Sequence, residues 1–108
     1  MDDVERLRRF CVDDVPLEGG SAGPWSEALD ARTVALIRIG ALIATSAPPA
    51  SMRSAVDEAV AAGVTVHEIV AVLDGLVGVV GLPRAVAAAP RIAVALGYGE
   101  DLVPDPLL

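Results

Sequence analysis

Few side chains in this sequence combine the chemistry and the spacing that an active site needs. The chain has one histidine, His67, and one cysteine, Cys11. A lone imidazole without a nearby Asp, Cys or second His makes a poor metal or acid–base site, so we interpret His67 as a solvated residue. Cys11 lies on the apolar face of a predicted helix, and we interpret it as a packed small hydrophobe. A redox role for Cys11 would need a cysteine from another subunit.

Two of the eight basic residues, all of them arginines, are candidates for holding an anion. Arg38 stands in the middle of an apolar helix, and a buried arginine must be paired. We expect Arg38 to be substantially buried, with its guanidinium paired to a carboxylate, for example across an interface, or to backbone carbonyls. Alternatively, Arg38 faces a pocket and holds an anionic ligand, because guanidinium binds carboxylates bidentately. Arg53 is the second candidate, but its spacing from Asp57 also suits a surface ion pair.

The elements that position these residues are all predicted to be helices, because no segment alternates like a strand. Local signals mark where the helices begin and end. Asp30 is a predicted N-cap, and Thr65 with Glu68 forms a predicted capping box. Gly63 and Gly97 are expected to end the helices before them.

The predicted helices span residues 2–12, 31–45, 48 or 49 to 62, 65–81 and 83–96. Pro90 falls inside the last of these and is expected to kink or divide it. Residues 16–24 are expected to form a loop, because they are rich in glycine and proline. Residues 98–108 are expected to form an extended acidic tail.

The composition indicates one small domain that shares apolar surface with another subunit. We expect the 108 residues to form a single domain over positions 1–108. Apolar residues make up 54% of the chain, and the mean hydropathy is +0.57. A small domain cannot cover so much alanine, valine, leucine and isoleucine alone. We therefore expect a homo-oligomer.

Charge and segment length argue against two classes of partner. The net charge is −7, and the basic cluster at residues 6–9 is offset by neighbouring acids, so we expect no nucleic-acid binding. The longest run without a charged residue, 39–52, is shorter than the roughly 20 residues of a membrane span. The acidic start of the chain is unlike a signal peptide, and the single cysteine precludes an internal disulfide. We expect a cytoplasmic protein without a metal ion or cofactor.

The order and spacing of the helix signals resemble the carboxymuconolactone decarboxylase family, which includes the alkylhydroperoxidase-D-like enzymes. The resemblance covers roughly residues 29–96. Its markers are the helix at 30–45, the AxxAG turn at 59–63, the capping box at 65–68 and the GxP at 81–83. It implies an all-α, single-domain bundle of about five to six helices that assembles into a trimer or hexamer.

The reactive side chains of that family are absent at the matching positions. The peroxidase branch carries CxxCxxxH. Aligned on Gly63, its cysteines fall at Pro48 and Ser51 and its histidine at Ala55. The relay glutamate of the same branch falls near Leu36, and the decarboxylase branch also relies on a histidine at the position of Ala55. Ser51 keeps a hydroxyl but has no base one helical turn away. The resemblance therefore argues against the activities of the family.

These observations lead us to interpret the chain as a catalytically degenerate member acting as an oligomeric binding, assembly or regulatory domain. The ligand-binding candidates are Arg38, Arg53 and Ser51, for a small anionic ligand. The alternative is an enzyme with relocated chemistry, such as a lyase or hydrolase acting on a small organic acid. A peroxidase working through Cys11 is a third hypothesis, and it lacks a resolving thiol. A polar cavity beside Ser51 and Ala55 would favour an enzyme or ligand binder, whereas a filled, dry site would favour a structural role.

Overall fold

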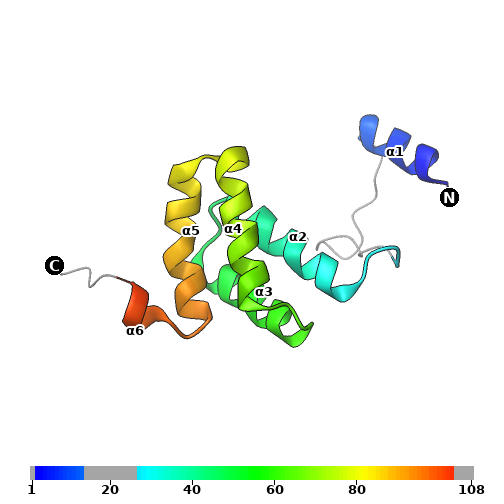
Figure 1. The fold of residues 1–108 in the computed structure, drawn as a ribbon. Coiled ribbons are helices and arrows are strands. Elements are labelled where there is room, and N and C mark those ends of the chain that lie inside the picture. Colours follow the sequence, from blue (N-terminus) through cyan, green and yellow to red (C-terminus); the bar gives the residue numbers. More distant parts are fainter. Residues whose placement is uncertain (1, 14–26, 104–108) are drawn as a thin grey trace.

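The computed structural model describes residues 2–13 and 27–103, and these residues are helical without a strand (Figure 1). The helices are α1 (Asp3–Cys11), α2 (Ala31–Ala44), α3 (Pro49–Ala61), α4 (Val66–Val80), α5 (Leu82–Ala95) and α6 (Gly99–Leu102). The predicted all-α fold of five to six helices is confirmed. The predicted loop at 16–24 lies outside the described residues, and the single domain over 1–108 stays a prediction.

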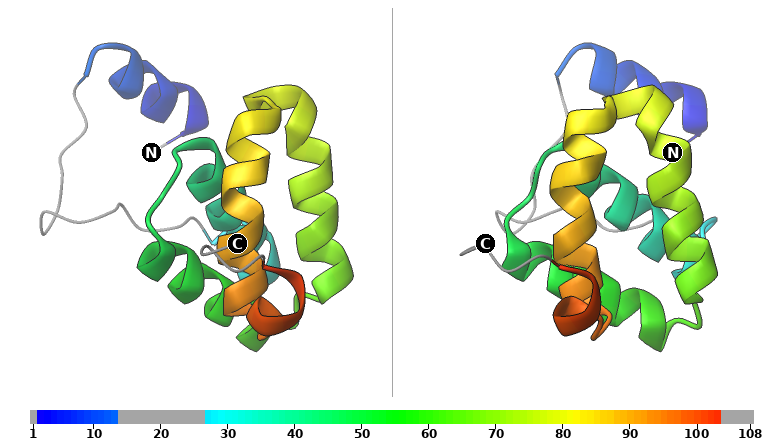
Figure 2. Two further views of the ribbon diagram at one scale, coloured as in Figure 1. Left: turned by 90° about the vertical axis from the view of Figure 1, so that its left-hand side faces the viewer. Right: turned by 60° about the vertical axis from the view of Figure 1, so that its left-hand side comes forward.

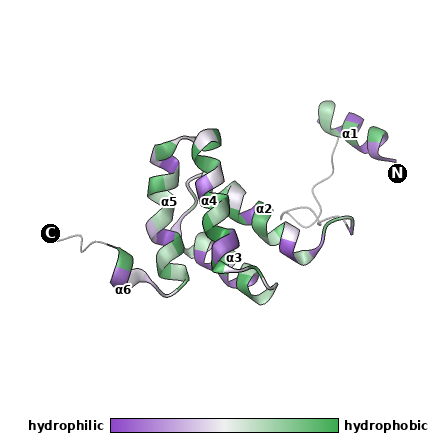
Figure 3. Ribbon diagram, in the orientation of Figure 1, coloured by the Kyte–Doolittle hydropathy of each residue, from purple (hydrophilic) through white to green (hydrophobic). Residues whose placement is uncertain are grey.

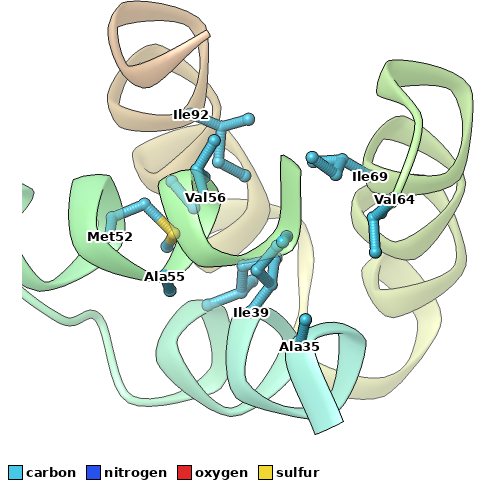
Figure 4. Packing of buried hydrophobic residues seen from close by; sticks show 11 residues of the cluster. Ala35, Ile39, Met52, Ala55, Val56, Val64, Ile69 and Ile92 are labelled. Carbon is cyan, nitrogen blue, oxygen red and sulfur yellow. The ribbon is translucent and has the colours of Figure 1, made fainter. Parts of the chain in front are cut away.

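The core lies among α2, α3, α4 and α5 (Figures 2 and 4). Its fully buried large side chains come from α2, α3 and α4. They are Ile39, Ile43, Met52, Val56 and Ile69. Those on α2 and on α3 are four residues apart, which places them on the inner face of each helix. Helix α1 contacts none of the other described helices.

The helix boundaries follow from local hydrogen bonds, as predicted. The Asp30 carboxylate accepts from the Thr33 backbone N–H at 2.7 Å. The Thr65 hydroxyl accepts from the Glu68 N–H, and the Glu68 carboxylate accepts from the Thr65 N–H at 3.0 Å, so the predicted capping box is confirmed. Gly63 has a φ of 88° and lets the chain leave α3 in a left-handed turn.

Gly81 is the single residue that joins α4 to α5, and the two helices lie side by side (Figures 1 and 2). Its φ of 92° is in the left-handed region, which an L side chain adopts only with strain. The glycine therefore allows the tight turn by which α5 folds back against α4.

The last helical region departs from the sequence prediction in two places. Helix α5 runs through Pro90 without being divided. Proline leaves the Val86 carbonyl without its helical partner, but Pro90 and Val86 are both exposed, so water can bond to that carbonyl. The expected extended tail contains α6, which begins after Gly97 turns the chain with a φ of 90°. Residues 104–108 lie outside the described part.

Candidate functional site

The positions that align with the family's reactive residues do not form a polar site. Pro48 is the exposed N-cap of α3, and Ser51 is half-buried in the first turn. Ala55 is only 1% exposed and belongs to the buried cluster drawn in Figure 4. Leu36 is half-buried and packs against the same cluster. No polar or charged side chain is buried among the described residues, so this region is apolar core.

Arg38 pairs with the carboxylate of Glu58, which α3 brings beside α2. The predicted carboxylate partner is thus present, and it belongs to the same chain. The predicted substantial burial is wrong, because 37% of the Arg38 side chain is exposed. Arg38 lies beside the buried face of α2 and not on it, since Ala35, Ile39 and Ile43 form the face that packs against the core.

A pocket of about 250 Å³ lies beside this ion pair, lined by residues of α2 and α3 together with Ala62. Both charges of the Arg38–Glu58 pair line it. An anion entering there would have to compete with the glutamate already bound to the guanidinium. The geometry therefore favours a structural role for Arg38 in joining α2 to α3.

Arg32 forms a second link between helices, from the start of α2 to the start of α4. Its guanidinium pairs with the Glu68 carboxylate, which also closes the capping box. The Thr65 backbone N–H and then the Arg32 guanidinium lower the pKa of Glu68 from its ordinary value. The neighbouring His67 is exposed, in agreement with its interpretation as a solvated residue.

Arg53 and Arg91 line a pocket of about 440 Å³ between α3 and α5. Arg53 is exposed and makes neither the expected ion pair with Asp57 nor a hydrogen bond to any other described residue. Arg91 is half-buried and donates to the backbone carbonyl of Ala47, between α2 and α3. The sequence analysis did not identify Arg91, because its proximity to Arg53 depends on how α5 packs against α3.

Cys11 is exposed, so its interpretation as a packed residue is wrong for the single chain. Its helix, α1, presents Val4, Leu7 and Phe10 as exposed apolar residues. The described residues include no group of three or more His, Cys, Asp or Glu side chains that could hold a metal ion. None of the described helices has the length and apolar character needed to cross a membrane.

Comparison with known proteins identifies the family of the chain. No curated protein and no solved structure gives a significant match. The profile of the carboxymuconolactone decarboxylase family matches residues 17–95, which is most of the chain and includes all of α2, α3, α4 and α5. The chain therefore belongs to the carboxymuconolactone decarboxylase family.

Proposed function

We propose that this chain is a catalytically inactive member of its family that acts in the cytoplasm as an oligomeric binding or assembly domain. The observation that carries the proposal is the apolar packing at two aligned positions, where Ala55 is buried and Leu36 packs against the core. Both known chemistries of the family need polar groups in this region. Among the aligned positions only Ser51 keeps a hydroxyl, and with Ala55 one helical turn away it has no base to activate it.

The proposed homo-oligomer, a trimer or hexamer by family resemblance, is supported by the apolar residues that the single chain leaves exposed. Figure 3 shows apolar residues along much of α4 and α5. Several are large and exposed, and these are Val66, Val70, Val79, Leu82, Val86 and Val94. A groove of about 260 Å³ between α4 and α5 is lined by apolar side chains, with Asp74 as the one charged residue among them. Burial of this surface against a second copy would remove it from water.

The assembly is tested by light scattering coupled to size-exclusion chromatography at micromolar protein. We expect a mass of three or six chains. A homogeneous monomer would contradict the oligomer and would leave the apolar surface of α4 and α5 without an explanation.

The absence of the family chemistry is tested by assaying thiol-dependent hydroperoxide reduction and decarboxylation of a muconolactone. We expect no turnover above background. The variant Cys11→Ser is the matched control, because Cys11 is the only thiol in the chain. Peroxidase turnover that disappears in Cys11→Ser would identify Cys11 as a nucleophile and refute the proposal.

An enzyme with relocated chemistry is the second candidate, because the pocket at Arg53 and Arg91 could hold an organic acid. The other residues that line this pocket are Pro49, Ala50, Pro90, Val94 and Ala95. This set contains no carboxylate, imidazole, hydroxyl or thiol. The lining therefore supports binding of an acid and supplies no group for a lyase or hydrolase reaction.

A further inference from the structure

We propose that the pocket between α3 and α5 binds an aliphatic carboxylate, such as a medium-chain fatty acid. In this arrangement Arg53 and Arg91 hold the carboxylate, while Pro90 and Val94 contact the hydrocarbon chain. The inference rests on the proposed binding function and specifies the ligand class of that function. The pocket volume, about 440 Å³, is within the range of small-molecule sites, roughly 300–1,000 Å³.

The charges of the two arginines are not neutralised by a described acid. Arg8, Arg32 and Arg38 each pair with a glutamate. Arg53 has no such partner, and the described hydrogen bonds of Arg91 go only to the backbone carbonyls of Ala47 and Ser46. A carbonyl accepts a hydrogen bond but carries no net charge, so the pocket keeps two positive charges in a chain of net charge −7.

The first turn of α3 adds to this positive potential. It begins at Pro49, contains no acidic residue, and has no side chain that caps its backbone N–H groups. The positive end of the helix dipole is therefore exposed where Pro49 and Ala50 line the pocket. This feature strengthens the attraction for an anion that the two guanidinium groups already provide.

The remaining lining favours an anion with an apolar tail over an inorganic ion. Every lining residue other than the two arginines is alanine, valine or proline. Val94 is 52% exposed, so a hydrocarbon chain lying on it would remove apolar surface from water. An inorganic phosphate would contact the arginines and gain nothing from these walls.

Charge also argues against a two-fold contact in which this pocket meets the same pocket of a second copy. A contact about a two-fold axis places the same patch on both sides of the interface. Here it would bring two Arg53 and two Arg91 side chains together without an acid on either side. A carboxylate ligand instead supplies the missing negative charge.

Isothermal titration calorimetry of the full chain with butanoate, hexanoate and octanoate tests the proposal. We expect affinity to rise with chain length by up to about fourfold per methylene, the fold-change equivalent to roughly 0.8 kcal/mol. Octanol, which lacks the charge, and inorganic phosphate, which lacks the tail, should each bind at least tenfold more weakly than octanoate. Phosphate binding as tightly as octanoate would show a site for inorganic anions only and would overturn the proposal.

The variant Arg53→Gln should weaken octanoate binding about tenfold, because it removes a charge-assisted contact at an exposed position. Arg84→Gln is the matched control, since Arg84 is also exposed, lies on α5 and does not line the pocket. Ala50→Trp should block the pocket while leaving both arginines in place. Absence of saturable octanoate binding, or equal weakening by Arg53→Gln and Arg84→Gln, would refute the ligand. Neither result would bear on the oligomer or on the missing peroxidase activity.

Discussion

The variant Ala55→His places an imidazole at the position that the resemblance assigns to the family's histidine, and it tests whether this part of the core is filled. Ala55 is 1% exposed and packed among buried side chains that include Ile39 and Met52. Overpacking of such a site costs about 1–3 kcal/mol. A buried imidazole without a hydrogen-bond partner costs about 1–3 kcal/mol more, and no buried polar residue among those described could serve as a partner. We therefore expect Ala55→His to lower the free energy of unfolding by about 2–6 kcal/mol.

That loss is a large share of the 5–15 kcal/mol by which domains are typically stable. At about 4–8 °C per kcal/mol, it should lower the melting temperature by roughly 10–50 °C. Urea unfolding followed by circular dichroism at 222 nm measures the change directly. The wild type and variants must be compared at one protein concentration, because dissociation of an oligomer contributes to the apparent stability.

Ala61→His is the matched control, since Ala61 lies on the same helix but is exposed. We expect it to change the free energy of unfolding by no more than about 0.5 kcal/mol. If Ala55→His were as stable as Ala61→His, Ala55 would border a hollow that can accept an imidazole. That result would refute the filled site and reopen the possibility of residual catalysis.

The remaining predictions concern the ion pairs and caps that join the helices. The Arg38 and Glu58 side chains are both more than a third exposed, so the ion pair should contribute little to stability. A double-mutant cycle with Arg38→Met and Glu58→Gln should give a coupling free energy of about 0–1 kcal/mol. A coupling of several kcal/mol would indicate that the pair is buried in the oligomer. Thr65→Ala should cost about 1 kcal/mol in urea unfolding, since it removes an N-cap. The pKa values of Glu68 and Asp30 in the folded state are lowered from the ordinary values of 4.5 and 3.8. The stability that these two carboxylates contribute is therefore fully present above the ordinary values, and it is lost as the pH falls through the folded-state pKa values. Glu68→Gln should therefore reduce the loss of stability between pH 6 and pH 3.

The helix boundaries were predictable because the interactions that set them are local in sequence. Asp30 bonds three residues ahead, and Thr65 and Glu68 bond to each other. Gly63 needs only its own left-handed φ. Residue types at fixed short spacings are enough to identify such features.

Features that depend on packing between helices could not be predicted in the same way. The apolar character of α2 predicted that the helix is buried on most sides, so Arg38 was expected in the protein interior. Its actual position, at the border of the buried face, depends on where α3 and α4 pack against α2. Arg91 was missed because nothing in its local sequence shows that it reaches Ala47, 44 residues earlier. Pro90 was expected to kink or divide α5, but it does not divide the helix, and its exposure lets water bond to the carbonyl that it leaves unpaired.

The arginines near the contacts between helices are of two kinds. Some pair with a glutamate of another helix, and others have no acidic partner among the described residues and are free to bind a ligand. Arg38 and Arg32 tie α2 to α3 and to α4, each through a glutamate, and their charges are thereby used within the chain. The region to which the resemblance assigns the family's reactive groups is apolar core around Ala55. Because Arg53 and Arg91 line one pocket without a described acidic partner, they are the charges best placed to meet an external anion. In the proposed arrangement, the ligand therefore binds at a different surface of α3 from the one that faces the core.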